Sequence, residues 1–200
     1  MAEHTTVDFW FDPVCPWAWL TSRWLLEAAT VRHLDPRWHV MSLAVLNAGK
    51  EGMDQDKLAS YWGPVRVLAA ARAKAGDDSV LALYTAMGTR IHLEQAGLGR
   101  DMIEAALAAA DLPPELADAM DSADLDDEVR ASHSAAMALV GDDVGTPVIS
   151  FDGYSIFGPV VSPTPRGEAA GRLWDGVATV VSTPGFFELK RGRQQAPVLI

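Results

Sequence analysis

The fold of this chain is decided around Asp12-Pro13-Val14-Cys15-Pro16-Trp17-Ala18-Trp19, which places the only cysteine between a predicted strand and a predicted helix. Residues 7–11 before it are rich in β-branched and aromatic side chains, which favour a half-buried strand. Asp12-Pro13 ends that run. From Pro16 onward apolar residues recur at three- and four-residue steps, which predicts a helix. Because proline suits the first helical position, Cys15 is expected at or next to the helix N-cap.

A thiol at a helix N-terminus lies beside unpaired backbone N–H groups and the positive end of the helix dipole. Both favour thiolate over thiol, and cysteines placed in this way have pKa values lowered to roughly 3.5–7.5. We therefore expect Cys15 to be an activated nucleophile with a partly exposed sulfur, as thiol exchange requires. Asp12 opposes this activation, because a nearby carboxylate raises the pKa of a thiol. The alternative is an inert cysteine that is buried only for packing.

The composition is that of a globular chain with a large apolar core. It has 200 residues, of which 49% are hydrophobic, and a net charge of −11, which opposes binding to nucleic acid or to anionic membranes. The N-terminus has neither the basic nor the apolar region of a signal peptide, and no apolar run is long enough for a membrane span, so we expect a cytoplasmic protein. The histidines show no spacing suited to metal ligands, so no metal site is expected. No glycine-rich dinucleotide fingerprint follows a strand, so neither flavin nor nicotinamide is expected.

The rest of the chain predicts an α/β fold in which a helical region interrupts a sheet. A second strand is expected at residues 37–46, helices at 65–75, 102–110, 127–140 and 166–179, and a hairpin of strands 147–151 and 154–157 about Asp152-Gly153. These parts fit a thioredoxin fold with an all-helical insertion. We predict a discontinuous thioredoxin-fold domain of residues 1–56 and 140–200, with an insertion of residues 57–139.

Several longer motifs carry a resemblance to a known family. They are Asp8-Phe9-Trp10-Phe11-Asp12-Pro13, Thr21-Ser22-Arg23-Trp24, His39-Val40-Met41-Ser42-Leu43-Ala44, Trp62-Gly63-Pro64-Val65-Arg66, Leu83-Tyr84-Thr85-Ala86-Met87-Gly88, Pro165-Arg166-Gly167-Glu168 and Phe186-Phe187-Glu188-Leu189-Lys190-Arg191. With Cys15-Pro16-Trp17 and Val144-Gly145-Thr146-Pro147, they make the chain resemble the DsbA-like branch of the thioredoxin superfamily. Within that branch it closely resembles the actinobacterial mycothiol-dependent nitroreductase family.

The resemblance implies a Cys-Pro-Trp-Cys active site that works with the thiol mycothiol, the first cysteine being the nucleophile. This chain has Ala18 in place of the second cysteine. An alanine cannot attack a mixed disulfide at Cys15, so only a one-thiol cycle remains, in which a soluble thiol completes turnover.

The resemblance also implies the other members of the site. Thr146-Pro147 is expected as a cis peptide that faces the thiol, with the Thr146 backbone free to pair with a substrate. Trp17, Asn47, His92 and Thr146 are the candidate cofactor-binding residues. For Trp17 a core role is equally open, for Asn47 a role in a turn, and for His92 a structural role.

Three functions are compatible with the sequence. The first is a thiol-dependent oxidoreductase that reduces mixed disulfides or small electrophiles such as nitroaromatics with mycothiol. The second is a kappa-like thiol S-transferase or hydroxychromene-carboxylate-type isomerase, which the absence of a second cysteine favours. The third is a redox-inactive binding protein. The expected partners are a low-molecular-weight thiol and a small substrate, and a homodimer is left open.

Overall fold

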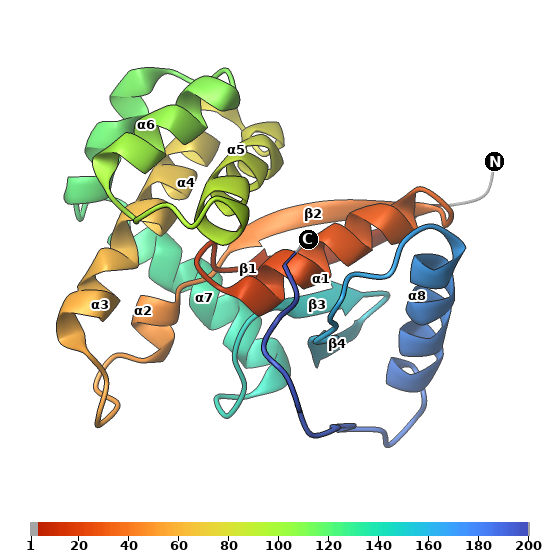
Figure 1. Cartoon of the computed structure of the whole chain (residues 1–200). Helices are drawn as coiled ribbons and strands as arrows, with labels where there is room; N and C mark the ends of the chain where they lie inside the picture. The colour runs from red at the N-terminus through yellow and green to blue at the C-terminus, as the bar shows by residue number, and fades with distance from the viewer. Residues whose placement is uncertain (1–3, 200) are drawn as a thin grey trace.

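The computed structural model describes residues 4–199. The elements follow one another as β1 (Thr5–Phe11), α1 (Pro16–Ala29), β2 (Leu34–Val40), α2 (Leu43–Leu46), α3 (Gln55–Ser60), α4 (Trp62–Ala75), α5 (Asp78–Gly88), the π-helix η1 (Thr89–Leu93), α6 (Arg100–Ala109), the 3-10 helix η2 (Pro114–Asp121), α7 (Asp126–Val140), β3 (Val148–Phe151), β4 (Tyr154–Phe157) and α8 (Glu168–Val181). Helices alone lie between β2 and β3 (Figure 1). This is the predicted α/β class, with a helical region inserted along the chain between two strands of the sheet.

The sheet has the strand order β2-β1-β3-β4, with β1 in the interior. β1 pairs in parallel with β2, from Thr5 with Leu34 to Phe11 with Val40, and β3 pairs antiparallel with both β1 and β4. β1, α1 and β2 thus form a βαβ unit, and the predicted hairpin is confirmed. Asp152 and Gly153 in the hairpin turn both have positive φ, of 49° and 82°, as a two-residue hairpin turn requires. This arrangement is that of a thioredoxin fold.

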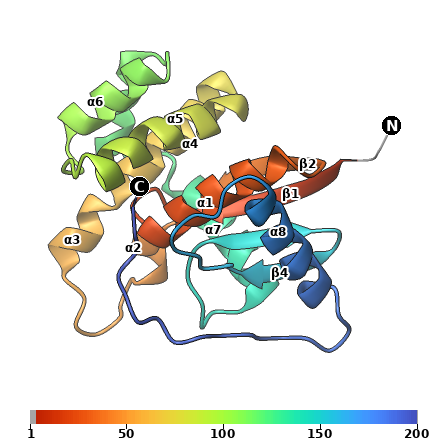
Figure 2. The same cartoon turned by 45° about the vertical axis from the view of Figure 1, so that its right-hand side comes forward.

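Strand β1 supplies apolar side chains to both faces of the sheet. Val7, Phe9 and Phe11 have no exposed surface and belong to the main core with α1 and α8, whereas Trp10 packs in a second cluster with Met137 of α7. Helices α1 and α8 therefore cover one face and α7 covers the other, as two views of the molecule show (Figures 1 and 2). The alternation of buried side chains decides which residues of β1 face each layer, and Cys15 lies just past the C-terminal end of the strand, where α1 begins.

The second strand differs from its predicted range of residues 37–46. It starts at Leu34 and ends at Val40, and Leu43–Leu46 form the short helix α2. Pro36 is tolerated inside β2 because this is an edge strand. The Oγ of Ser42 accepts a hydrogen bond from the Val45 N–H at 3.3 Å, which caps α2 and stops the strand from continuing.

The helical region joins the sheet at α7. This helix contacts α4 as well as β2 and β4, and it ends at Gly141, as its sequence predicts. The boundaries of the predicted insertion, residues 57–139, stay a prediction. Among residues 4–199 no helix is both long enough and apolar enough to cross a membrane.

Candidate active site around Cys15

Cys15 lies at the junction of β1 and α1, in the N-cap position that its sequence predicts. Its backbone is extended (φ −82°, ψ 113°), Pro16 starts the helix, and the Cys15 carbonyl accepts from the Trp19 N–H at 3.0 Å. The sulfur accepts a hydrogen bond from the Ala18 N–H at 3.4 Å. A backbone donor of the first helical turn therefore points at Sγ, as thiolate stabilisation requires.

The second component of the site comes from the segment before β3. The Thr146–Pro147 peptide is cis, and the Cys15 thiol donates to the Thr146 carbonyl oxygen, with Sγ 3.6 Å from it. The Thr146 hydroxyl in turn donates to the carbonyl of Trp10 at 3.4 Å. The fold thus brings together two predicted site segments that are far apart in the chain.

The thiol itself is more buried and less acidic than the sequence predicts. Cys15 is only 6% exposed, and desolvation by this burial raises its pKa to about 11. The Ala18 N–H and the guanidinium of Arg193 lower the pKa, whereas the charge of Asp12 raises it further. The expected low pKa and partly exposed sulfur are therefore wrong for this resting structure, because the cost of removing the thiolate from water exceeds the effect of one helix end.

Asp12 is the second titratable group of the active-site turn, residues 12–15, which joins β1 to α1. It is fully buried, and its two carboxyl oxygens accept from the Val14 N–H at 2.8 Å and from the Leu43 N–H at 2.6 Å. Burial raises its pKa to about 7, against the opposing effect of the two N–H donors. Asp12 thus ties the active-site turn to the start of α2 and changes charge near neutral pH.

The three remaining candidates, Trp17, Asn47 and His92, lie in different environments. Trp17 is half-buried against the core, and the guanidinium carbon of Arg193 lies 4.9 Å from its ring centroid. Asn47 caps α2, with Nδ2 donating to the Leu43 carbonyl at 2.9 Å, so its amide group serves a turn. His92 is 7% exposed on η1, and its Nε2 donates to the Pro13 carbonyl at 2.9 Å. Burial lowers the pKa of His92, so the ring is neutral at pH 7.

Arg193 lies against the candidate site, although no sequence pattern predicts it there. It lies outside every motif, and only structure shows that the C-terminal tail returns to Trp17. The one available signal was local charge: Lys190, Arg191 and Arg193 place three cations within four positions of a chain whose net charge is −11.

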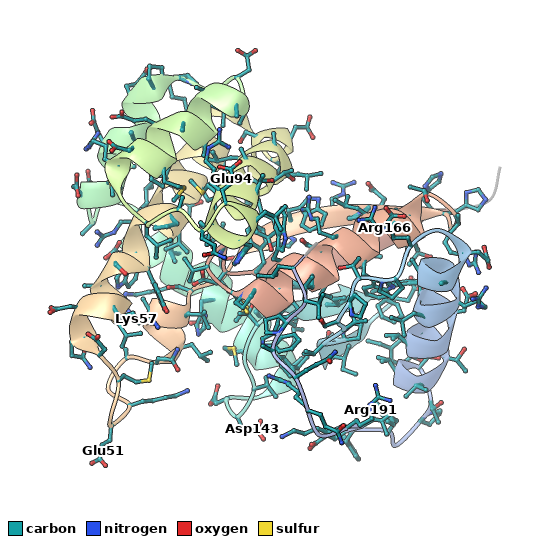
Figure 3. The ribbon with its side chains drawn as sticks, viewed as in Figure 1. Glu51, Lys57, Glu94, Asp143, Arg166 and Arg191 are labelled. Carbon is teal, nitrogen blue, oxygen red and sulfur yellow. The ribbon has the colours of Figure 1, made fainter. Side chains whose placement is uncertain are left out.

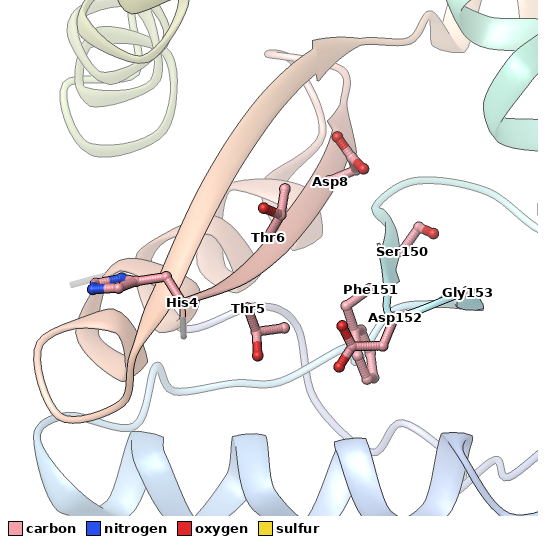
Figure 4. A pocket seen from close by; sticks show the side chains of 8 residues that line it. All are labelled: His4, Thr5, Thr6, Asp8, Ser150, Phe151, Asp152 and Gly153. Carbon is pink, nitrogen blue, oxygen red and sulfur yellow. The ribbon is translucent and has the colours of Figure 1, made fainter. Parts of the chain in front are cut away.

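A hollow on the surface lies apart from this site. A cavity of about 570 Å³ lies between the start of β1, near His4 and Asp8, and the β3–β4 turn at Asp152 (Figure 4). It is at the opposite end of β1 from Cys15, a separation of about 20 Å for a seven-residue strand. Within residues 4–199 no three His, Cys, Asp or Glu side chains are grouped so that they could hold a metal ion.

Two sequence comparisons find relatives of this chain. The family model described as Rv2466c-like, mycothiol-dependent nitroreductase Rv2466c, matches residues 14–191. The uncharacterized protein Rv2286c of Mycobacterium tuberculosis is 32% identical over 202 residues, covering 97% of this chain and 85% of that protein.

Three solved structures share the fold at low sequence identity. A probable DsbA oxidoreductase, SCO1869 from Streptomyces coelicolor, has a TM-score of 0.60 and 19% identity, covering 96% of each chain. The cytosolic disulfide reductase DsbM from Pseudomonas aeruginosa, solved with GSH, has a TM-score of 0.56 and 18% identity, covering 87% of this chain and 99% of its own. A 2-hydroxychromene-2-carboxylate isomerase has a TM-score of 0.61 and 15% identity, covering 87% of this chain and 93% of its own.

Proposed function

This chain belongs to the Rv2466c-like family of mycothiol-dependent nitroreductases, and from that premise we propose that it is a cytoplasmic one-thiol oxidoreductase. Cys15 is its sole nucleophile, and mycothiol is its soluble thiol partner. Its substrates are mixed disulfides and small electrophiles such as nitroaromatics. The observation that carries the proposal is the sulfur of Cys15, which lies at the N-cap with the Ala18 N–H directed at it and the Thr146 carbonyl beside it.

The cycle on a mixed disulfide of a substrate thiol and mycothiol has two exchange steps. The Cys15 thiolate attacks the mycothiol sulfur, the disulfide bond breaks, and the substrate leaves as a thiol that carries the proton lost from Cys15. A second mycothiol thiolate then attacks the mycothiol sulfur of the Cys15 adduct, which forms mycothiol disulfide and frees Cys15. The substrate sulfur is reduced, the second mycothiol is oxidised, and the first mycothiol stays at the disulfide level throughout, so no second protein thiol is needed.

For a nitroaromatic substrate, mycothiol is again the source of the electrons. Two mycothiol molecules supply two electrons and two protons, which convert the nitro group to a nitroso group with release of water and mycothiol disulfide. The role of Cys15 is then to exchange with mycothiol.

The resting hydrogen bond of the thiol has a consequence for substrate binding. Sγ donates to the Thr146 carbonyl only while it carries its proton. Ionisation of Cys15 removes that donor and leaves the carbonyl free to accept from an amide N–H of the thiol partner. Because burial raises the thiol pKa to about 11, we expect ionisation to accompany the arrival of the partner rather than precede it.

Intact-mass analysis tests this function. After incubation with mycothiol disulfide, the protein is expected to gain the mass of one mycothiol, which dithiothreitol removes. The Cys15→Ser variant is the matched control and gains none. Failure of the folded wild-type protein to form the adduct at any pH up to about 10 would refute thiol exchange as its activity.

The absence of a second cysteine also supports a second candidate, a thiol S-transferase or isomerase in which Cys15 only orients a soluble thiol. Ala18 is completely buried where the second sulfur would be, so this chain cannot give up two electrons by forming an internal disulfide. Under that function no covalent adduct accumulates during turnover, and the same mass measurement separates the two.

A further inference from the structure

The C-terminal tail returns to the active-site end of α1. After α8 the chain forms no further helix or strand up to residue 199, and it passes beside the first turn of α1 in both views (Figures 1 and 2). Two contacts hold its end: the Val198 N–H donates to Ser162 Oγ at 2.8 Å, and Leu199 packs against the main core. The tail therefore has a defined path over this part of the surface.

Within this tail, Arg193 contacts the active-site helix directly. Its guanidinium carbon lies 4.9 Å from the centroid of the Trp17 ring, and Trp17 is in the same helical turn that Cys15 caps. A cation–π contact of this kind favours one placement of a flexible side chain. The family match ends at residue 191, so Arg193 lies outside the matched residues.

The charges that face the sulfur come from several elements. Asp12, in the active-site turn, raises the pKa of Cys15, and Arg193, from the tail, lowers it. Tyr84 of α5 is buried, with its own pKa raised above the ordinary value, and His92 of η1 is neutral against the Pro13 carbonyl. Among these groups Arg193 is the cation whose charge opposes that of Asp12, and its effect on the thiol pKa is smaller than that of Asp12.

We propose that Arg193 is a positioning residue of this active site: the tail places its guanidinium on Trp17, where its positive charge stabilises the thiolate of Cys15. This inference rests on the proposed thiol chemistry and extends it. In thiol–disulfide exchange the negative charge is shared among the attacking, central and leaving sulfurs. A fixed cation next to Trp17 stabilises that charge at each stage without making a bond.

Alkylation of Cys15 by iodoacetamide tests the proposal, because the reagent is neutral, reacts with the thiolate and needs no mycothiol. Rates are measured between pH 8 and 10 for the wild type, Arg193→Gln, Arg193→Lys and Arg191→Gln. Arg191 is the matched control, since it lies on a lower stretch of the tail, away from the start of α1 (Figure 3). Far-ultraviolet circular dichroism and thermal midpoints confirm that each variant is folded.

We expect Arg193→Gln to react about threefold more slowly than the wild type at low salt, because an exposed charge acts through partly screened interactions. Arg193→Lys restores most of the rate, and Arg191→Gln equals the wild type. The difference between wild type and Arg193→Gln disappears at about 1 M salt.

Identical pH profiles for the wild type and Arg193→Gln at low salt would overturn the proposal. So would a variant lacking residues 191–200 that reacts faster at every pH while Arg193→Gln is unchanged, since the tail would then only shield the thiol. A thiol that reacts in none of the variants refutes it as well. If the charge effect is present but mycothiol disulfide forms no adduct, the proposed function fails and the role of Arg193 stands.

Discussion

Replacing Asp12 with asparagine should change how the stability of the protein depends on pH. The carboxyl group of Asp12 is completely buried, and burial raises its pKa from 3.8 to about 7. The folded state therefore binds this proton more tightly than the unfolded state does. Its contribution is fully present below the unfolded pKa and is lost as the pH rises towards 7.

The size of the effect follows from the two pKa values. A change of one unit corresponds to 1.36 kcal/mol, so the full difference is about 4 kcal/mol, of which about 3 kcal/mol falls between pH 4.5 and 8. Asparagine cannot ionise, and its single oxygen leaves either the Val14 or the Leu43 N–H without an acceptor. That loss costs about 1–3 kcal/mol at every pH, so only the slope with pH reports the ionisation.

Urea unfolding, followed by tryptophan fluorescence at several pH values from 4.5 to 8, measures this slope. As the pH rises from 4.5 to 8, the unfolding free energy of the wild type should fall by about 3 kcal/mol relative to that of Asp12→Asn. Asp56→Asn, which removes an exposed carboxylate of α3, controls for the loss of one charge. Parallel profiles for wild type and Asp12→Asn would refute the reasoning. The variant should also be alkylated faster at Cys15, because the Asp12 charge that raises the thiol pKa is gone.

Two further substitutions test the packing and the chemistry of the site. Gly88→Ala places a Cβ at a clashing distance from the buried Trp19 ring and should destabilise the protein by about 2–3 kcal/mol in urea unfolding, whereas Gly97→Ala, which meets nothing within 4 Å, should change it by less than about 0.5 kcal/mol. Equal losses for the two would show that the ring can move aside. Ala18→Cys should restore the two-thiol cycle: after mycothiol disulfide treatment its mass should fall by two hydrogens and iodoacetamide should no longer label it. An adduct that persists on Cys15 in this variant would contradict the geometry of the first helical turn.

The parts of the fold that the sequence predicts are those set by local signals. Pro16 after a strand-like run places Cys15 at an N-cap, Asp152-Gly153 makes a hairpin turn, and Gly141 ends α7. Each depends on residues within a few positions of one another, so pattern and structure agree.

The features that the sequence does not predict depend on contacts between distant segments. The pKa of Cys15 rises because the folded chain removes its sulfur from water, and no local pattern measures that burial. Residues 43–46 look like a continued strand until Ser42 and Asp12 provide acceptors that start a helix there. Arg193 meets Trp17 only because the tail crosses the molecule.

Two titratable groups hold the active-site turn: His92, through its hydrogen bond to the Pro13 carbonyl, and Asp12. Their pKa values are shifted in opposite directions. Burial lowers the pKa of His92, and its Nε2–H donates to the carbonyl in either charge state of the ring, so this link to η1 persists during mild acidification. Asp12, one residue before Pro13, has by then already become neutral. A shift from pH 8 to 6 therefore alters the electrostatic field at the sulfur while the mechanical connection to the helical region stays in place.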